Sequence, residues 1–221
     1  LIKKICMEKR GWLVEVVLEP REVLVQKQFF IDFTKAQSLS SAIEAPFFAF
    51  SKTRLLQNYA AFTSMLPGVK VMYAVKANPH VKVLASLAQA GSGFDAACAP
   101  EIKKLLSIGV PASSIIFSHP IKTEYDLLYA KKQGVKRIAF DNVEELRKLA
   151  RVYPDAELVL RLAISNYSSK IQLSKKFGCP VNDALGLLLE AKALGLNPIG
   201  LSIHVGCECT DPMTYAYAVD S

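Results

Sequence analysis

From residue 44 onward, hydrophobic positions alternate regularly between two kinds of pattern. Stretches with helical spacing occur at about 52–65, 79–90, 99–108, 122–133, 142–152, 180–195 and from 211 onward. Between them lie short apolar runs that predict buried strands: Pro46–Phe50, Val69–Val75, Gly93–Ala97, Ile115–Ser118, Arg137–Asp141, Leu158–Ala163 and Ile199–Val205. Strands separated by such helices indicate parallel β-α-β units, and near-continuous apolar runs are typical of a sheet covered on both faces.

Turn and capping residues agree with these boundaries. The candidate N-caps are Ser51, Asp141 and Asn142; Pro79, Pro180 and Pro212 lie near first turns, and Gly91, Gly109, Gly134 and Gly195 follow predicted helices. Residues 1–43 differ, because Trp12–Leu18 and Val23–Gln26 are β-prone and Pro20 lies between them. The pattern therefore predicts an N-terminal β segment at 1–43, a strand or hairpin, followed by an α/β unit at 44–221.

Composition limits the classes of function. The chain has 221 residues, of which 51% are hydrophobic and 21% charged, enough for one sizeable globular core. Its net charge of +7 suits an anionic ligand such as a phosphorylated cofactor. The lysines occur mostly as scattered pairs, such as Lys103-Lys104 and Lys131-Lys132, so no nucleic-acid partner is expected.

Several features favour a cytoplasmic protein. No apolar segment approaches the roughly 20 residues of a membrane span, so no membrane partner is expected. The start, Leu1 to Cys6, lacks the apolar core and cleavage site of a secretion signal. The five cysteines have no framework spacing, which favours reduced thiols in the cytosol. Cys207-Glu-Cys209 has no matching pair elsewhere, so no metal site is predicted.

The most informative stretch for chemistry is Tyr73–His80. Lys76 ends the apolar run Val69–Val75, and the following Ala-Asn-Pro breaks the strand. A lysine at this point is expected to have a desolvated amine, which favours its neutral, nucleophilic form. Such an amine can hold an aldehyde cofactor as a Schiff base. The alternative is a lysine that reaches from the strand end into solvent, and this stretch alone leaves both interpretations open.

Three more ionisable residues lie in or at the ends of predicted strands: Asp95, Arg161 and His204. Each alone has a plain interpretation, as a helix-capping aspartate, a paired core arginine or a satisfied buried histidine. Active sites of parallel α/β folds collect at the carboxyl ends of the strands. Together with Lys76, these residues therefore predict one site in an apolar pocket.

Ordered motifs between Pro46 and about Tyr217 carry a family resemblance. They are Tyr73–Pro79, Gly93–Ala97 with Glu101, Leu158–Leu162, Leu173–Gly178, Ser202–Gly206 and Cys209–Pro212. The chain resembles the ornithine/diaminopimelate/arginine decarboxylases that depend on pyridoxal phosphate (PLP) and have an alanine-racemase-like barrel. Its last motif and its Leu-Ser-x-Lys-Phe-Gly segment are more similar to the ornithine decarboxylase branch. The resemblance implies a PLP-binding (β/α)8 TIM-type barrel, truncated here to about six of eight strands, without the family's C-terminal β domain.

The resemblance also implies roles for individual residues. Lys76 would form the Schiff base with PLP, and His204 would stack on the cofactor ring; these two are the predicted catalytic residues. Further implied cofactor contacts come from Ala74, Asp95, Glu101, Arg161, Gly206 and Cys207. Of these, the charged residues would orient the lysine and the ring, Ala74 would touch the cofactor, and the last two would help to hold its phosphate.

The function implied is decarboxylation of a basic amino acid, with L-ornithine to putrescine in polyamine biosynthesis favoured over lysine or diaminopimelate. The full-length form is expected to be a homodimer. Two alternatives stay open, a non-catalytic paralogue that binds proteins as antizyme-inhibitor-like relatives do, and a one-domain PLP carrier. Three residues depart from the family's motifs: Cys207 and Cys98 replace serines, and Glu208 replaces a glycine. A thiol is a weaker donor to phosphate than a hydroxyl, and a carboxylate there is electrostatically adverse.

Overall fold

A computed structural model of the chain describes residues 38, 50–164, 168–211 and 213–220. Apart from Ser38, the predicted N-terminal β segment at 1–43 lies outside the described residues, and so does the predicted strand Pro46–Phe50 apart from Phe50. The chain divides into two compact units, Leu1–Pro67 and Gly68–Ser221. In the first unit, helix α3 (Lys52–Met65) begins where Ser51 Oγ accepts a hydrogen bond from the Arg54 backbone N–H at 3.2 Å, as an N-cap does.

The second unit is built on one parallel sheet, whose strand order is β1-β2-β3-β4-β5-β7. Its six strands are β1 (Met72–Ala74), β2 (Gly93–Ala96), β3 (Ile115–Phe117), β4 (Arg137–Phe140), β5 (Glu157–Leu162) and β7 (Asn197–Ile203). Every neighbouring pair is parallel. The predicted α/β class is confirmed, and the six parallel strands of the described residues agree with the expectation of about six.

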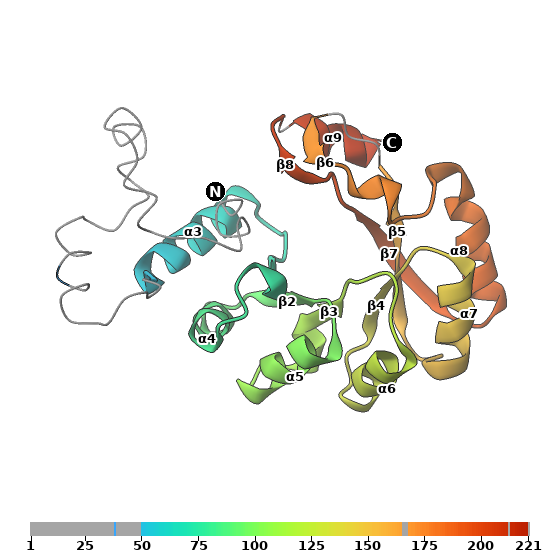
Figure 1. The fold of residues 1–221 in the computed structure, drawn as a ribbon, viewed down its shortest axis with the longest axis horizontal. Coiled ribbons are helices and arrows are strands. Elements are labelled where there is room, and N and C mark those ends of the chain that lie inside the picture. The colour runs from blue at the N-terminus through green and yellow to red at the C-terminus, as the bar shows by residue number, and fades with distance from the viewer. Residues whose placement is uncertain (1–37, 39–49, 165–167, 212, 221) are drawn as a thin grey trace. The chain divides into compact units, whose positions relative to one another are not determined.

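The connecting helices follow one another along one side of the strands (Figure 1). They are α4 (Val81–Gln89), α5 (Ala99–Ser107), α6 (Glu124–Lys132), α7 (Val143–Val152) and α8 (Ala184–Ala193). Helix α8 is preceded by a short 3-10 turn, η5 (Val181–Asp183), where the sequence predicts one continuous helix. Glycines with positive φ end α4, α5, α6 and α8, as predicted from their left-handed backbone preference.

The core lies between these helices and the sheet. Phe94, Phe117 and Phe140 on three successive strands are fully buried. Leucines on the sheet-facing sides of the helices, such as Leu105 and Leu149, are also fully buried. Burial of such large side chains stabilises a fold by about 1.5–3 kcal/mol each, so this layer fixes the strand order and the positions of the strand ends.

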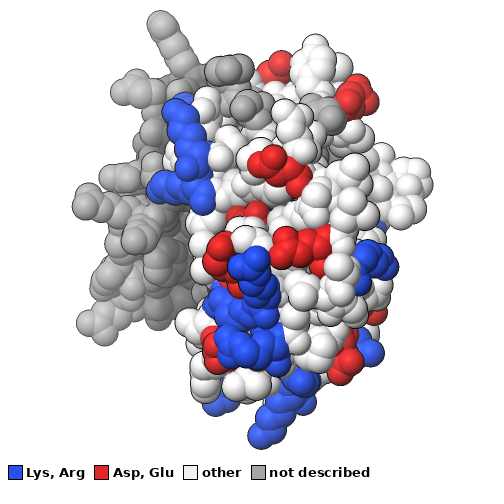
Figure 2. All heavy atoms as spheres, turned by 90° about the vertical axis from the view of Figure 1, so that its right-hand side faces the viewer, with Lys and Arg blue, Asp and Glu red and all other residues white. Residues whose placement is uncertain are grey.

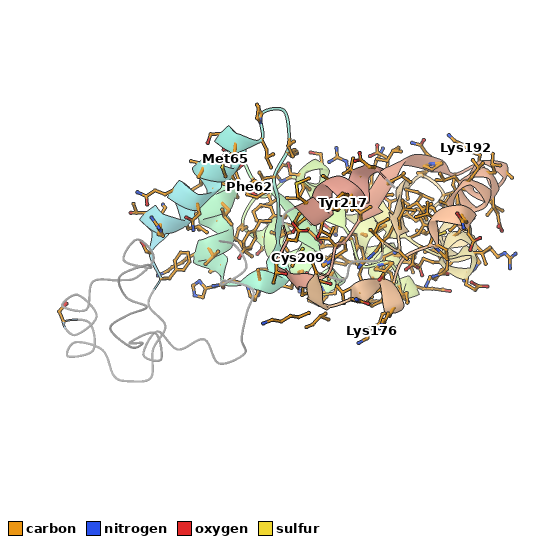
Figure 3. All side chains as sticks on the ribbon, turned by 90° about the horizontal axis from the view of Figure 1, so that it is seen from above. Phe62, Met65, Lys176, Lys192, Cys209 and Tyr217 are labelled. Atoms are coloured by element: carbon orange, nitrogen blue, oxygen red, sulfur yellow. The ribbon has the colours of Figure 1, made fainter. Side chains whose placement is uncertain are left out.

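A small second sheet was not predicted. Strands β6 (Ser169–Ile171) and β8 (Cys207–Cys209) pair antiparallel, and helix α9 (Met213–Asp220) follows them. A small core of Ile164, Val205, Cys209 and Ala218 joins these elements, which lie close together in Figures 1 and 3. Ser169–Ile171 and Cys207–Cys209 contain charged or polar residues and are not apolar runs like those that predicted the parallel strands, so tertiary contacts define this sheet.

Charges of both signs lie close to one another on the face that carries α7 and α8 (Figure 2). Arg147 on α7 lies 3.6 Å from Glu190 on α8, and Arg151 lies 2.6 Å from Glu124 on α6. Among the described residues, no helix is both long and apolar enough to cross a membrane. On this face, basic residues thus form ion pairs with acidic residues of neighbouring helices.

Candidate active site at the carboxyl ends of the strands

The predicted site residues lie at the carboxyl ends of parallel strands, and hence at one edge of the sheet. Ala74 ends β1 and is in register with Asp95 of β2. Arg161 lies near the end of β5, opposite Ser202 of β7, and His204 directly follows β7. Because the strands are parallel, their carboxyl ends present these side chains to the same region.

Electrostatic coupling indicates that four of these residues share one environment. Burial raises the pKa of Asp95 above its ordinary value, and a hydrogen bond from Ser118 and the positive charges of Lys76 and Arg161 oppose that shift. Burial lowers the pKa of His204, and the same two cations lower it further. The acid and the imidazole thus both lie within reach of both cations, as the sequence predicts for a single site.

Lys76 differs from its prediction. Strand β1 ends at Ala74, earlier than the predicted run Val69–Val75, and Val75–Ala77 form a 3-10 turn, η2. Lys76 lies in the middle of this turn and is exposed, so the prediction of a desolvated amine is wrong for this structure. The cause is the early end of the strand, which carries the side chain beyond the apolar layer. The amine is accessible to a carbonyl compound that enters the site.

Ser118, which the sequence analysis did not single out, holds Asp95. Its hydroxyl donates a hydrogen bond to Asp95 Oδ1, and its backbone N–H donates to the Ala96 carbonyl at 3.0 Å. A hydrogen bond to the ionised carboxylate stabilises the charged form and offsets part of the burial cost. Ser118 directly follows β3, so the strand-end rule that selected Lys76 and His204 could have found it.

Glu101 has a contact other than those implied by the resemblance. Its Oε2 accepts the backbone N–H of Ala97 at 2.7 Å, from the first turn of α5. The carboxylate therefore fixes the loop that joins β2 to α5, directly after Asp95. Any role of Glu101 in orienting Lys76 stays a prediction, and the described contact supports the backbone beside the site.

Arg161 is half-buried, and burial and two nearby carboxylates shift its pKa in opposite directions. Burial lowers the pKa of its guanidinium, whereas the negative charges of Asp141 and Asp95 raise it. Its Nε is buried and has no hydrogen-bond partner among the described residues. The guanidinium carbon lies 5.2 Å from the centre of the Phe177 ring. A buried, unpaired donor at the end of a strand is suited to an incoming acceptor.

Asp141 does not cap α7 as the sequence predicted. Asn142 is the N-cap, and its Oδ1 accepts the Glu145 N–H at 2.8 Å. Asp141 instead accepts the backbone N–H of Gly178 through Oδ2 at 2.7 Å. The partner is 37 positions away, so local sequence could not reveal this contact. Asp141 thus belongs to the charged surroundings of Arg161.

The turn after β7 fixes the imidazole of His204. The Gly206 N–H donates to His204 Nδ1 at 2.9 Å, so the proton of the neutral ring lies on Nε2. Gly206 has a φ of 94°, and a Cβ there would lie 2.6 Å from Ser169 Cβ and 2.7 Å from the Ile171 carbonyl. Cys207 begins β8 and is exposed. The close approach of β6 therefore requires glycine before Cys207.

We expect His204 to titrate below its ordinary pKa of 6.5, because burial and the charges of Arg161 and Lys76 disfavour the imidazolium. Nuclear magnetic resonance of the three histidine rings against pH measures this directly, and His204→Gln assigns the signal. The unfolded chain takes up this proton at a higher pH than the folded chain does, so stability should fall as pH drops through 6.5. A midpoint above 6.5 for the His204 ring would contradict the described environment.

The arrangement fits a flat, anionic ligand that carries a carbonyl group. Lys76 offers an accessible amine, Arg161 offers positive charge and an unpaired N–H, and His204 offers a planar neutral ring. Asp95 adds a carboxylate for a positively charged ring atom. PLP has these complementary features, so the residues present fit this cofactor.

Comparison with known proteins also indicates a protein that binds PLP. Residues 52–221 match the family described as pyridoxal-dependent decarboxylase, pyridoxal binding domain. The chain belongs to this family, whose cofactor is PLP.

Three relatives illustrate its range. Ornithine decarboxylase of Neurospora crassa is 41% identical over 203 residues, which are 89% of this chain and 42% of that protein. Antizyme inhibitor 2 of Xenopus laevis is 40% identical over 173 residues, 78% of this chain and 38% of that protein. The crystal structure of SrLDC with PLP and cadaverine has a TM-score of 0.79 and 34% identity, and covers 86% of this chain and 48% of that one. The chain thus spans under half the length of these relatives.

Proposed function

We propose that this chain is the cofactor-binding part of a PLP-dependent decarboxylase that acts on a basic amino acid. The observation that carries the proposal is the accessible Lys76 amine, at the same sheet edge as Asp95, Arg161 and His204. Membership of the pyridoxal-binding family supports it. The sequence alone suggested the same four residues from their places in the strands.

When bound, PLP supplies the electron sink that allows carbon dioxide to leave the α-carbon of an amino acid. The chain's own residues supply binding and charge. Lys76 is the point of covalent attachment through its Nζ, and Arg161 attracts anionic groups through its charge and its unpaired Nε–H. His204, neutral near pH 7 with its proton on Nε2, presents a flat ring without adding another positive charge.

Asp95 has the opposite electrostatic role. Its carboxylate is half-buried and held by Ser118, so its orientation is fixed before any ligand arrives. In the ionised form it stabilises positive charge nearby, on Lys76 or on a ligand's ring nitrogen. Since burial raises the pKa of Asp95, the carboxylate is also better suited to exchange a proton than an exposed aspartate would be.

L-Ornithine, with putrescine as the product, is the substrate we propose first, and lysine is the alternative. The relative from Neurospora crassa is an ornithine decarboxylase, and SrLDC was crystallised with cadaverine, the decarboxylation product of lysine. Release of carbon dioxide from carboxyl-labelled ornithine, lysine and diaminopimelate would rank the three. The homodimer implied by the resemblance stays a prediction that sedimentation would test.

Borohydride reduction in the presence of PLP should label this chain at Lys76, because reduction makes the attachment to an amine permanent. Peptide mapping by mass spectrometry should locate the added mass there. Lys76→Ala should abolish the specific label, whereas Lys82→Ala, which removes an exposed lysine of α4, should leave it unchanged. A label on other lysines only, or no label on chain shown to be folded by circular dichroism, would overturn the proposal.

A non-catalytic, protein-binding paralogue is the second candidate. Cys207 stands where the family has serine and is exposed at the start of β8, where a thiol is a poor donor to phosphate. Glu208 follows it where the family has glycine. Antizyme inhibitor 2 of Xenopus laevis is among the relatives. The same trapping experiment separates the candidates, because folded chain that takes no label at Lys76 favours this one.

A further inference from the structure

The segment Leu173–Gly178 has no role in the function proposed above. It begins with a 3-10 turn, η4 (Leu173–Lys175), and then continues towards the end of β5. Lys175 and Lys176 are exposed, and Lys176 lies at the outer margin of the domain in Figure 3. Phe177, the next residue, is half-buried and packs against groups of the candidate site. The segment thus turns one aromatic side chain inward directly after two exposed lysines.

Backbone hydrogen bonds fix this segment to β5 beside Arg161. The Cys179 N–H donates to the Arg161 carbonyl at 2.8 Å, and the Ala163 N–H donates to the Cys179 carbonyl at 2.8 Å. The Gly178 N–H donates to Asp141 Oδ2 at 2.7 Å. The two residues after Phe177 are therefore fixed, Cys179 to the strand that carries Arg161 and Gly178 to Asp141.

The Phe177 ring contacts two other side chains. The guanidinium carbon of Arg161 lies 5.2 Å from the ring centre, which is within the range of a cation–π interaction. The ring of His119 meets it edge-on, with centres 5.6 Å apart and planes at 75°. His119 is itself fixed, because its Nδ1 accepts the Ile121 N–H at 3.2 Å. Phe177 is thus supported by His119 and contacts Arg161.

Arg161 needs such support, because Nε has no hydrogen-bond partner among the described residues. A long side chain without such a bond loses rotamer freedom when it binds a ligand, which weakens binding. A planar ring against the planar guanidinium restricts its orientation in advance and leaves Nε–H free for an acceptor.

We propose that Phe177 is a positioning residue that orients the guanidinium of Arg161 towards the anionic cofactor, with His119 supporting the ring. The inference rests on the proposed function for its ligand. The contacts of Phe177 with Arg161 and His119 do not depend on that ligand.

The test compares PLP dissociation constants, measured by absorbance, for two substitutions. Phe177→Leu keeps an apolar side chain but removes the ring, and should weaken binding about tenfold. Phe177→Tyr keeps the ring and should stay within about twofold. Leu105→Ala, a change in the buried face of α5, serves as the control; it should lower stability without altering PLP affinity. Equal losses for Phe177→Leu and Phe177→Tyr would overturn the proposal.

A double-mutant cycle tests whether Phe177 acts through Arg161. In an Arg161→Met background, Phe177→Leu should weaken PLP binding by less than twofold, because the group that it positions is gone. Loss of the full factor of about ten in both backgrounds would show an effect independent of Arg161 and overturn the proposal.

A measurement without cofactor separates this inference from the proposed function. Arg161 Nε–H, assigned with Arg161→Lys, should show a ring-current shift in its nuclear magnetic resonance signal that Phe177→Leu removes and Phe177→Tyr retains. If the wild-type chain does not bind PLP, the proposed function fails, and this signal still decides whether Phe177 orients Arg161. An Arg161 signal unchanged by Phe177→Leu would contradict the positioning role.

Discussion

Replacing Lys122 by alanine is expected to lower the free energy of unfolding by about 3 kcal/mol or more, because it breaks a buried ion pair from one side. The Lys122 side chain is 0% exposed and lies 2.9 Å from Glu145, which is 2% exposed. Its amine also donates to the carbonyls of His119, Pro120 and Ala139, at 3.0, 3.2 and 2.5 Å. The substitution would leave these acceptors and part of a carboxylate without a partner.

Denaturation in urea measures this loss. Arg151→Ala is the matched control, because Arg151 and Glu124 form an ion pair at 2.6 Å with both side chains largely exposed, and such pairs contribute little. A double variant, Lys122→Met with Glu145→Leu, should recover part of the stability, since neither charge of the pair is then left buried alone and Lys148, the other partner of Glu145, is 22% exposed. If Lys122→Ala and Arg151→Ala lower the free energy of unfolding by equally small amounts, the buried ion pair contributes no more to stability than the exposed one.

The pH dependence of this pair has a defined sign. Burial lowers the pKa of Lys122 from 10.5 to about 8, although the charge of Glu145 opposes the shift. Between these two values the unfolded chain binds more protons than the folded chain, so the contribution of Lys122 to stability rises with pH from about 8. The stability difference between wild type and Lys122→Ala should therefore grow over this interval.

The burial of Lys122 and its pairing with Glu145 could not be predicted from the sequence. The pattern placed it at the start of a predicted helix, 122–133, where a lysine is normally solvated. Its partner Glu145 is 23 positions away, on the next helix, and neither residue stands out locally. Helices and strands could be predicted because their periods extend over many residues. In the structure Lys122 precedes α6, which begins at Glu124, so its buried ion pair depends on how this loop packs against α7, which no local pattern contains.

The same distinction applies to the candidate site. Lys76, Asp95, Arg161 and His204 could be placed together from sequence because the ends of parallel strands lie at one edge. The exposure of Lys76 could not be predicted from the sequence, because it follows from the early end of β1 at Ala74. The contact between Phe177 and Arg161 likewise depends on the hydrogen bonds that join Cys179 to β5, which no local pattern predicts.

Replacing Gly178 by alanine should lower the free energy of unfolding by about 3–5 kcal/mol, from strain and from lost hydrogen bonds. The residue has a φ of 103°, and an added Cβ would lie 2.5 Å from the Ala163 nitrogen and 2.7 Å from the Leu162 carbonyl carbon. These are backbone atoms at the end of β5, so no side chain can move aside. The segment would have to leave the strand and lose its bonds to Arg161, Ala163 and Asp141.

Gly109→Ala provides the control, because Gly109 has a φ of 83° but nothing within 4 Å of an added Cβ. Gly109→Ala should lower the free energy of unfolding only because alanine disfavours the left-handed backbone conformation, by about 1–2 kcal/mol. Amide hydrogen exchange locates the difference. The Cys179 and Ala163 N–H groups should exchange faster in Gly178→Ala than in the wild-type chain, and at the wild-type rate in Gly109→Ala. Equal costs for the two variants, with both amides still protected, would mean that the chain after Phe177 does not need its close approach to β5.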